Sequence, residues 1–221
     1  MEEGIKKNPA IVIEDHIRRK RFYLTEPESK EILSAYGISC AYAHLAKKPD
    51  EVIRICNQIG YPVVMKVVSR EVVHKSDFGG VRLNIKNDAD AQAAYREIEA
   101  TFKDRGLIGV SIQEMAPPGI EVIIGVTLDE TFGHVLMFGL GGIFVEVLED
   151  VSFRSIPLDE RDVEEMMKET RGYRILNGYR GTKGDIDALR DLLLKISNLV
   201  QEFPVITEMD LNPVFLYEKG Y

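Results

Sequence analysis

Residues 61–83 read YPVVMKVVSREVVHKSDFGGVRL, and this stretch decides the expected local fold. The run VVMKVV at 63–68 is apolar apart from Lys66, as in a strand that is buried on both faces except at that lysine. The run VRLNIK at 81–86 alternates in polarity and predicts a second strand. Between them, HKSDFGG at 74–80 predicts a glycine-containing loop.

Lys66 is an unusual residue for such a strand. A lysine there loses hydration unless its ammonium group meets an anion or extends to solvent. It is either a phosphate ligand at the floor of a nucleotide cleft or a water-facing lysine on an edge strand, and the strand pattern alone does not choose between these.

His74 and the glycine pair Gly79 and Gly80 suggest phosphate chemistry. Adjacent glycines leave backbone N–H groups free to approach phosphate oxygens. A neutral imidazole, abundant near neutral pH, can attack a phosphoryl group and carry it as a phosphoramidate. The other interpretation is a hairpin turn with a surface histidine, which the spacing alone favours.

The composition is that of a soluble globular protein. The 221 residues are enough for one large domain or two small lobes, and the net charge of −8 argues against nucleic acid as the main partner. Cys40 and Cys56 lack ligand-like spacing and read as reduced thiols. The charged N-terminus is not a signal peptide, and the longest apolar stretch falls short of roughly 20 residues, so we expect a cytoplasmic protein.

The remaining elements predict an α+β fold with two packed lobes rather than a doubly wound sheet. Expected helices start at the capping box Thr25–Glu28 and after Pro49, and cover 88–104, 159–168 and, after Asp185, 186–202. Four strand candidates with short connections are expected to be antiparallel neighbours: 110–115, 121–128, 135–138 and 143–147. A Pro-Pro-Gly turn within 116–119 suggests a hinge, which gives a loosely held arm at 1–24 and lobes at 25–116 and 117–221.

The segment QEMAPPG, followed by Glu121, suggests an adenine site. An adenine ring needs a flat apolar slot with backbone hydrogen bonds, which Met115 and Ala116 could supply, while Glu121 could accept from a ribose hydroxyl. An ordinary hairpin with an exposed glutamate is the alternative, and it is commoner for such a segment taken alone.

The segment TEMDLNPV places Glu208, Asp210 and Asn212 at alternate positions, so on a strand they share one face. Three oxygen-bearing side chains suit Mg²⁺, which prefers oxygen ligands and keeps several waters. A strand with a solvated acidic face is the alternative. The Asn-Pro pair is expected to end the strand where a ligand can reach it.

Basic residues elsewhere have less specific patterns. Arg154 is either a phosphate ligand or an exposed strand residue, and the Gly-rich loop at 171–183 suits anion capture but fits a solvated surface loop slightly better.

Taken together, four segments resemble one family. YPVVMKVVSREVVHKSDFGGVRL, QEMAPPGIEVIIGV, FGLGGIFVEVLEDVSFRSIPL and ITEMDLNPV occur in the order found in the β subunit of ADP-forming acetyl-CoA synthetase, a member of the NDP-forming acyl-CoA synthetases related to succinyl-CoA synthetase. The resemblance extends from about residue 20 to the C-terminus, and HKSDFGGV and EMDLNPV are its most specific parts.

This resemblance implies an ATP-grasp fold with nucleotide between two lobes. It implies the reversible reaction of acyl-CoA, ADP and phosphate to acid, ATP and CoA, with Mg²⁺ as cofactor and ATP or ADP as substrate. It also implies a separate α subunit that binds CoA and carries its own phosphohistidine, in an α2β2 heterotetramer.

The resemblance also implies roles for single residues. His74 is similar to a relay phosphohistidine, and Asp210 to an acid that steadies a phosphohistidine. Nucleotide contacts are implied for Lys66, Gly79, Gly80, Glu114, Met115, Ala116 and Glu121. Asn212 matches a Mg²⁺ ligand, whereas Glu208 as a second ligand follows only from strand alternation.

Two other functions remain open from the sequence. A self-sufficient ATP-grasp carboxylate ligase would act without a partner and without His74. A regulatory module would bind nucleotide without phosphorylation of His74.

Overall fold

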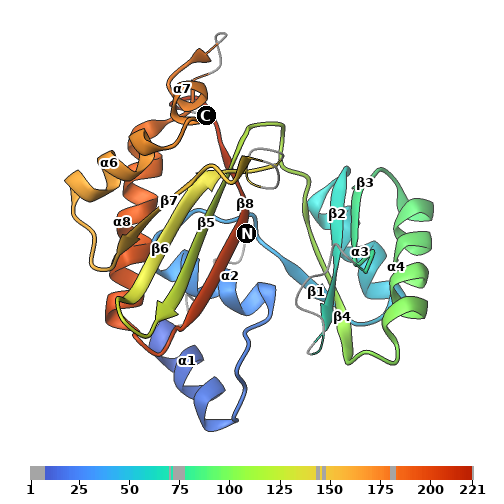
Figure 1. Cartoon of the computed structure of the whole chain (residues 1–221). Coiled ribbons are helices and arrows are strands. Elements are labelled where there is room, and N and C mark those ends of the chain that lie inside the picture. The colour runs from blue at the N-terminus through green and yellow to red at the C-terminus, as the bar shows by residue number, and fades with distance from the viewer. Residues whose placement is uncertain are drawn as a thin grey trace. The chain divides into compact units, whose positions relative to one another are not determined.

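The structure, a computed structural model, describes residues 8–69, 71, 78–142, 145, 148–179 and 183–220. The chain divides into two compact units, Met1–Ala116 and Pro117–Tyr221. The boundary lies in the Ala-Pro-Pro-Gly segment where the sequence predicts a hinge. Each unit contains one four-stranded sheet (Figure 1).

The first unit is built on a sheet with the strand order β1-β4-β2-β3, in which all neighbours are antiparallel. This first sheet puts β2 in an interior position. The elements of the unit are α1 (Pro9–Arg18), α2 (Glu26–Ala35), β1 (His44–Ala46), α3 (Pro49–Ile59), β2 (Val63–Ser69), β3 (Val81–Ile85), α4 (Asp88–Phe102) and β4 (Leu107–Glu114).

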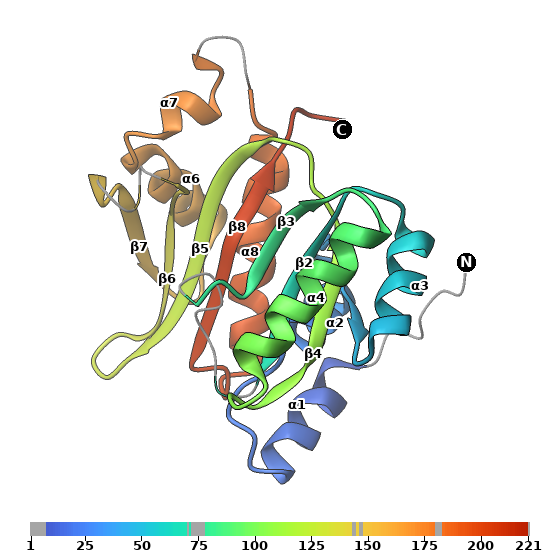
Figure 2. The ribbon, with the colours of Figure 1, turned by 90° about the vertical axis from the view of Figure 1, so that its right-hand side faces the viewer.

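The main core of this unit lies between the first sheet and the helices α3 and α4, which cover one face of it (Figure 2). Alternate residues of β2 enter the core: Val63, Met65 and Val67 are fully buried there. The predicted inward face of α4 is confirmed, because its buried residues are Ala91, Ala94, Tyr95, Ile98 and Phe102.

The N-terminal segment is more ordered than the sequence suggests. Residues 9–18 form α1, which Asn8 caps by accepting a hydrogen bond from the amide of Ala10 at 3.0 Å. Val12, Ile13 and His16 are buried. The prediction of a loosely held arm was therefore wrong for this part, because Val12, Ile13 and His16 form a buried helical face that a charge count does not reveal.

The second unit is built on a sheet with the strand order β7-β6-β5-β8, again antiparallel throughout. The helices α6 and α8 lie against one face of this second sheet (Figure 1). The elements are β5 (Ile120–Asp129), β6 (Gly133–Leu140), β7 (Val151–Ser155), α6 (Glu160–Glu169), α7 (Tyr173–Leu176), α8 (Ile186–Glu202) and β8 (Glu208–Leu216).

Three sequence expectations for the strands are corrected. β4 and β5 belong to different sheets, so they are not antiparallel neighbours. The expected strand at 143–147 is wrong at Val145, which is helical and accepts a hydrogen bond from the amide of Glu149 at 3.3 Å. The rest of that run lies outside the described residues. A short apolar run is compatible with a strand or with a buried helix, so its composition alone does not distinguish them.

The third correction concerns Pro213, which does not end a strand. β8 continues through it to Leu216. β8 is an edge strand, and its pairing with β5 shifts register between Val122 and Ile124. A proline is tolerated at an edge strand or a bulge, because no ladder hydrogen bond is lost there.

Candidate nucleotide site

Lys66 lies in the middle of an interior strand. It stands opposite Val81 on β3 and Ser111 on β4, so it is not on an edge. Its side chain is 24% exposed, and its ammonium group donates to Glu26 Oε1 at 2.8 Å. The interpretation of Lys66 as a water-facing lysine of an edge strand is therefore wrong.

A second lysine joins this contact from α2. Lys30 Nζ lies 3.1 Å from the same Glu26 oxygen and 2.5 Å from Gln113 Oε1. Burial lowers the pKa of Lys30, as does the charge of Lys66, while Glu26 opposes the change. Sequence reasoning missed this cluster, although the spacing of Glu26 and Lys30 by four residues was an available signal.

The glycine pair lies next to β2, the strand that carries Lys66. Gly79 is exposed and adopts a φ of 67°, which glycine takes without strain. The carbonyl of Gly80 accepts from the amide of Val67 at 2.7 Å. The structure thus brings Gly80 next to Lys66, whereas His74 lies outside the described residues.

The expected adenine hinge lies at the end of β4. Glu114 is exposed and pairs with Val63, and the amide of Met115 donates to the carbonyl of Pro62 at 3.2 Å. Met115 and Ala116 are half-buried. The expected adenine hinge therefore lies beside the start of β2. The pair formed by Glu114 and Val63 is three residue pairs along the ladder from the pair formed by Ser111 and Lys66.

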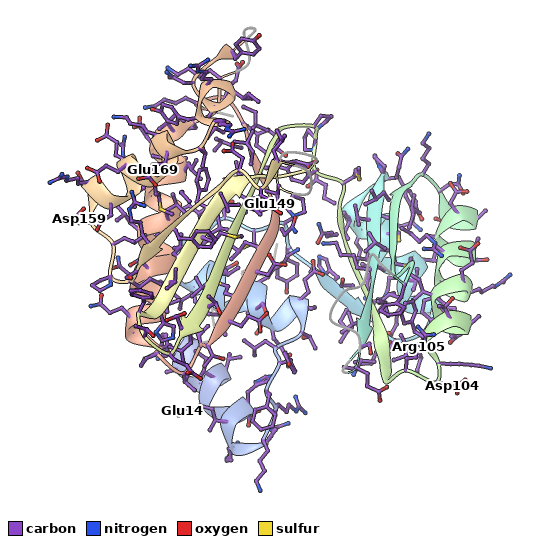
Figure 3. The ribbon with its side chains drawn as sticks, in the orientation of Figure 1. Glu14, Asp104, Arg105, Glu149, Asp159 and Glu169 are labelled. Atoms are coloured by element: carbon purple, nitrogen blue, oxygen red, sulfur yellow. The ribbon has the colours of Figure 1, made fainter. Side chains whose placement is uncertain are left out.

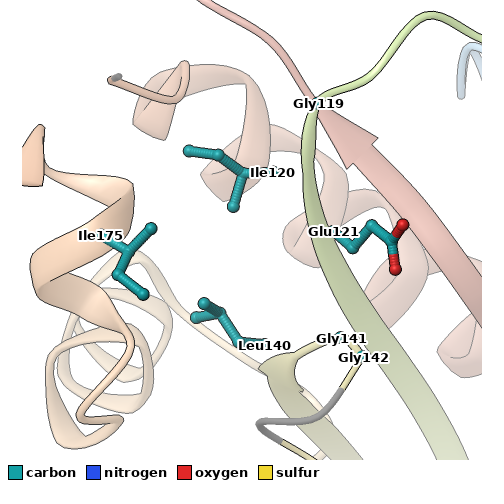
Figure 4. Close-up of a pocket in the computed structure, with 7 residues that line it drawn as sticks. All are labelled: Gly119, Ile120, Glu121, Leu140, Gly141, Gly142 and Ile175. Carbon is teal, nitrogen blue, oxygen red and sulfur yellow. The ribbon is translucent and has the colours of Figure 1, made fainter. Parts of the chain in front are cut away.

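Glu121 lies at the start of β5 beside an open pocket of about 320 Å³. The amide of Gly141 donates to the carbonyl of Glu121 at 2.8 Å, and a Cβ at Gly141 would lie 2.9 Å from that of Glu121, which favours glycine there. In Figure 4, Ile120, Leu140 and Ile175 face one another, and the Glu121 carboxylate points to the other side of β5. The apolar side of this pocket was not predicted.

The acidic segment of β8 has the predicted alternation. Glu208, Asp210 and Asn212 are exposed, and Met209 and Leu211 between them are half-buried. Glu208 pairs with Thr127 and Asp210 with Gly125 on β5, so both point to the face opposite the buried Val126. Asn212 lies in the register shift, between Leu211, which pairs with Ile124, and Val214, which pairs with Val122.

Arg154 is engaged in an ion pair rather than presented as a single exposed charge. Its guanidinium donates to both carboxylate oxygens of Glu169, at 2.9 and 2.5 Å (Glu169 is labelled in Figure 3). The fork geometry raises the pKa of Arg154 and lowers that of Glu169. This pairing does not favour the phosphate-ligand interpretation.

The expected basic loop is partly helical. Residues 173–176 form α7, and Asp150 accepts from the amides of Arg171 and Gly172 at 2.9 and 2.8 Å. This buried carboxylate anchors the segment, which the sequence analysis missed. Arg180 lies outside the described residues.

Within the described ranges, no three His, Cys, Asp or Glu side chains group closely enough to hold a metal ion. Mg²⁺ binds through only one or two carboxylates plus substrate phosphates and water, so the ligands predicted on β8 do not require a group of three such side chains. In the same ranges, no helix has the length and apolarity needed to cross a membrane.

Comparison with known proteins identifies the family. Residues 15–221 match the ATP-grasp domain. The chain is 49% identical over 200 residues to the β subunit of acetate–CoA ligase [ADP-forming] I of Pyrococcus furiosus, covering 88% of this chain and 86% of that one. It is 50% identical over 197 residues to acetate–CoA ligase [ADP-forming] II of Archaeoglobus fulgidus, covering 89% of this chain but only 29% of that longer protein.

Solved structures agree with these relatives. Acetyl-coenzyme A synthetase 1 of Ca. Korarchaeum cryptofilum, in complex with coenzyme A and Ca-AMPCP, superposes with a TM-score of 0.91 at 44% identity, covering 96% of this chain and 95% of that one. Another structure of that synthetase holds Mg-AMPPCP, with a phosphohistidine segment pointing towards the nucleotide binding site, at a TM-score of 0.81 and 42% identity over 95% of this chain and 93% of that one. The predicted ATP-grasp fold is confirmed, and the chain belongs to the family of β subunits of ADP-forming acetate–CoA ligases.

Proposed function

We propose that this chain is the nucleotide-binding subunit of an ADP-forming acyl-CoA ligase, with acetate as a substrate acid. The ligase would convert acyl-CoA, ADP and phosphate to acid, ATP and CoA, reversibly. The observation that carries this proposal is the 49% identity to a separate β subunit over nearly its full length. The acyl group is not specified by this chain, because the acyl pocket would lie mainly in the α subunit.

Nucleotide is proposed to bind between a small lobe, 25–116, and a large lobe, 117–221. Lys66 would contact the phosphates, and the amides of Gly79 and Gly80 would approach phosphate oxygens. Glu114, Met115 and Ala116 would hold the adenine, and Glu121 would accept from the ribose. The half-buried position of Lys66 on an interior strand supports the first of these roles, because its ammonium group is held in one place.

His74 is proposed to carry the phosphoryl group as a phosphoramidate. In the direction of ATP synthesis, an ADP β-phosphate oxygen would attack this phosphorus, the N–P bond would break, and His74 would regain a neutral imidazole. Asp210 would steady the phosphohistidine. The chemistry demands mainly position and charge neutralisation, which a fixed lysine and backbone amides supply.

Mg²⁺ is proposed as the cofactor, held by Asn212 and Glu208. The exposed, alternating oxygen-bearing side chains of β8 fit a cation that keeps most of its water and also binds phosphates. When bound, Mg²⁺ would neutralise the phosphate charge that develops during transfer.

An α subunit with its own phosphohistidine is the proposed partner, in an α2β2 assembly in the cytoplasm. The name of the Pyrococcus relative as a β subunit supports a second kind of subunit, and the Archaeoglobus relative is long enough to contain both parts in one chain.

The test is a phosphorylation assay. The chain, with and without its α partner, is incubated with γ-labelled ATP and Mg²⁺, alongside the His74→Ala variant and a His44→Gln control. We expect acid-labile, alkali-stable label on the wild type and the control but not on His74→Ala. Turnover of acyl-CoA with α present, but without label on His74, would contradict the relay.

The same assay separates the two other functions. A self-sufficient ligase would form acyl phosphate from acid and ATP without α, and His74→Ala would remain active. A regulatory module would bind ATP or ADP but show neither label nor turnover with α present. The resemblance to a separate β subunit favours the first proposal over both.

A further inference from the structure

The contacts of Lys66 point to a second cation in the phosphate site. Lys66 and Lys30 both donate to one oxygen, Glu26 Oε1, at 2.8 and 3.1 Å. Two ammonium groups on one carboxylate oxygen lie close together, and burial and the charge of Lys66 both lower the pKa of Lys30. Side-chain exposures of 24%, 19% and 15% for Lys66, Lys30 and Glu26 keep much of the water away from this contact.

The cluster lies on the face of the first sheet opposite the α3–α4 core. Lys66 pairs with Ser111, and Val64 pairs with Gln113, so these four residues share that face. Ser111 and Gln113 are buried polar residues, and Gln113 accepts from Lys30 at 2.5 Å. A polar stripe therefore runs across a sheet whose other face carries the buried Val63, Met65 and Val67 of β2.

Stability alone is a weak reason for such an arrangement. Removing two ammonium groups and a carboxylate from water costs free energy that their attraction barely repays. One carboxylate also leaves both lysines competing for the same acceptor oxygen. An anion with several oxygens would satisfy both lysines at lower cost.

We propose that Lys30 is a second phosphate-binding residue, and that the Glu26 carboxylate occupies the place of a phosphate oxygen until nucleotide binds. This inference rests on the proposed function, since it takes Lys66 as a phosphate ligand. The ligand chemistry is the diphosphate of ADP or the triphosphate of ATP. Lys30 and Glu26 reach the site from the first two turns of α2, while Lys66 reaches it from β2.

The test compares ADP with adenosine, which lacks phosphate. The whole chain is titrated calorimetrically with each, as wild type, Lys30→Met, Lys30→Arg and the exposed control Lys86→Met. A lost charge-assisted contact predicts that Lys30→Met weakens ADP binding about tenfold or more, while adenosine binding changes less than about twofold. Lys30→Arg keeps the charge and recovers most of the ADP affinity, and Lys86→Met matches the wild type.

Glu26→Gln supplies an independent measurement if Lys30→Met fails to fold. Removing a competing negative charge predicts ADP binding about threefold tighter, together with a lower melting temperature without nucleotide. A purely structural Glu26 predicts weaker ADP binding instead.

Three results would overturn the inference: ADP affinity unchanged in Lys30→Met, equal losses for ADP and adenosine, or weaker ADP binding in Glu26→Gln. If these occur while the wild type still forms ATP with its α partner, the proposed function stands and only the inference fails. If the wild type binds neither ADP nor ATP, the proposed function itself fails.

Discussion

The two sheets carry their candidate functional groups in different ways. In the first sheet, Lys66 lies on an interior strand and its ammonium group is held by Glu26. In the second sheet, Glu208, Asp210 and Asn212 lie on the edge strand β8 and are exposed. The ammonium group of Lys66 is thus fixed by an ion pair, whereas the three side chains of β8 are exposed to solvent.

This difference follows from the cost of removing each group from water. A lysine among buried valines needs a nearby counter-charge, so the sheet must supply one from a neighbouring helix. A carboxylate on an exposed edge, such as that of Glu208, keeps much of its hydration. In the function proposed above, Lys66 would be a fixed contact for phosphate, and the side chains of β8 would be adaptable oxygen ligands for a hydrated cation.

The largest expected effects test whether the two units are independent in stability. Phe102 on α4 and Leu193 on α8 are both 0% exposed, each in its own unit. Truncating each to alanine leaves a cavity that costs about 3–5 kcal/mol for Phe102→Ala and about 2–5 kcal/mol for Leu193→Ala. The chain has no tryptophan, so far-UV circular dichroism in urea is the suitable measurement.

Independent units predict that each variant shifts a different unfolding transition. A single transition that moves equally in both variants would show that the two units unfold together. Phe22→Ala is the control, because this phenylalanine is 90% exposed and its loss should change stability by less than about 0.5 kcal/mol.

The next effect tests the charge of Lys66. Lys66→Met keeps the length of the side chain but removes its charge, so ADP binding should weaken by about 1.5–3 kcal/mol, the range for hydrogen bonds to charged groups. Calorimetric titration with ADP measures this change, with Lys86→Met as the control for loss of a surface charge. ADP binding at wild-type strength in Lys66→Met would show that Lys66 does not bind the phosphates.

A smaller effect is expected at the proposed cation ligands of β8. Asn212→Ala should raise the Mg²⁺ concentration that gives half-maximal ATP formation about tenfold, as for other changes of metal-binding groups. Glu208→Gln should raise it less, because the glutamine amide keeps an oxygen that can bind the cation. Glu218→Gln, an exposed change beyond β8, serves as the control. An unchanged Mg²⁺ dependence in Asn212→Ala would exclude it as a ligand.

The sequence predicted those elements whose pattern is long and uninterrupted. The inward face of α4 was readable because five apolar residues repeat at helical spacing over fifteen residues. The alternation on β8 was readable for the same reason, although its continuation past Pro213 depends on a register shift that only the pairing with β5 creates.

The cluster around Lys66 could not be predicted in the same way. Glu26 and Gln113 are forty or more residues from the lysines that contact them in another element, and no local periodicity connects such positions. The sequence identified Lys66 as unusual because a lone charge in an apolar strand needs a partner. It could not say which residue provides that partner, since α2 is placed by tertiary packing.

The smallest expected effect concerns the start of α2, which positions Glu26 and Lys30. Burial raises the pKa of the Glu28 carboxyl, but hydrogen bonds from the hydroxyl and amide of Thr25 outweigh it, so the net pKa is lowered. A lowered folded-state pKa stabilises the protein above the unfolded value of 4.5, and this contribution disappears as the pH falls through the folded-state pKa.

Glu28→Gln should therefore reduce the acid sensitivity of the first unit. Glutamine still completes a capping box but carries no charge, so the variant should be slightly less stable than the wild type at neutral pH and should approach it at low pH. Between neutral pH and about pH 3.5, the wild type should lose more stability than the variant, by about 1 kcal/mol or less because the side chain is 30% exposed. Urea unfolding at both pH values measures the difference, and Glu14→Gln, at an exposed site on α1 (Figure 3), should retain the wild-type pH dependence. Equal acid sensitivity in wild type and Glu28→Gln would mean that α2 is held by its packing rather than by this cap, and the positions of Glu26 and Lys30 would then depend on the sheet alone.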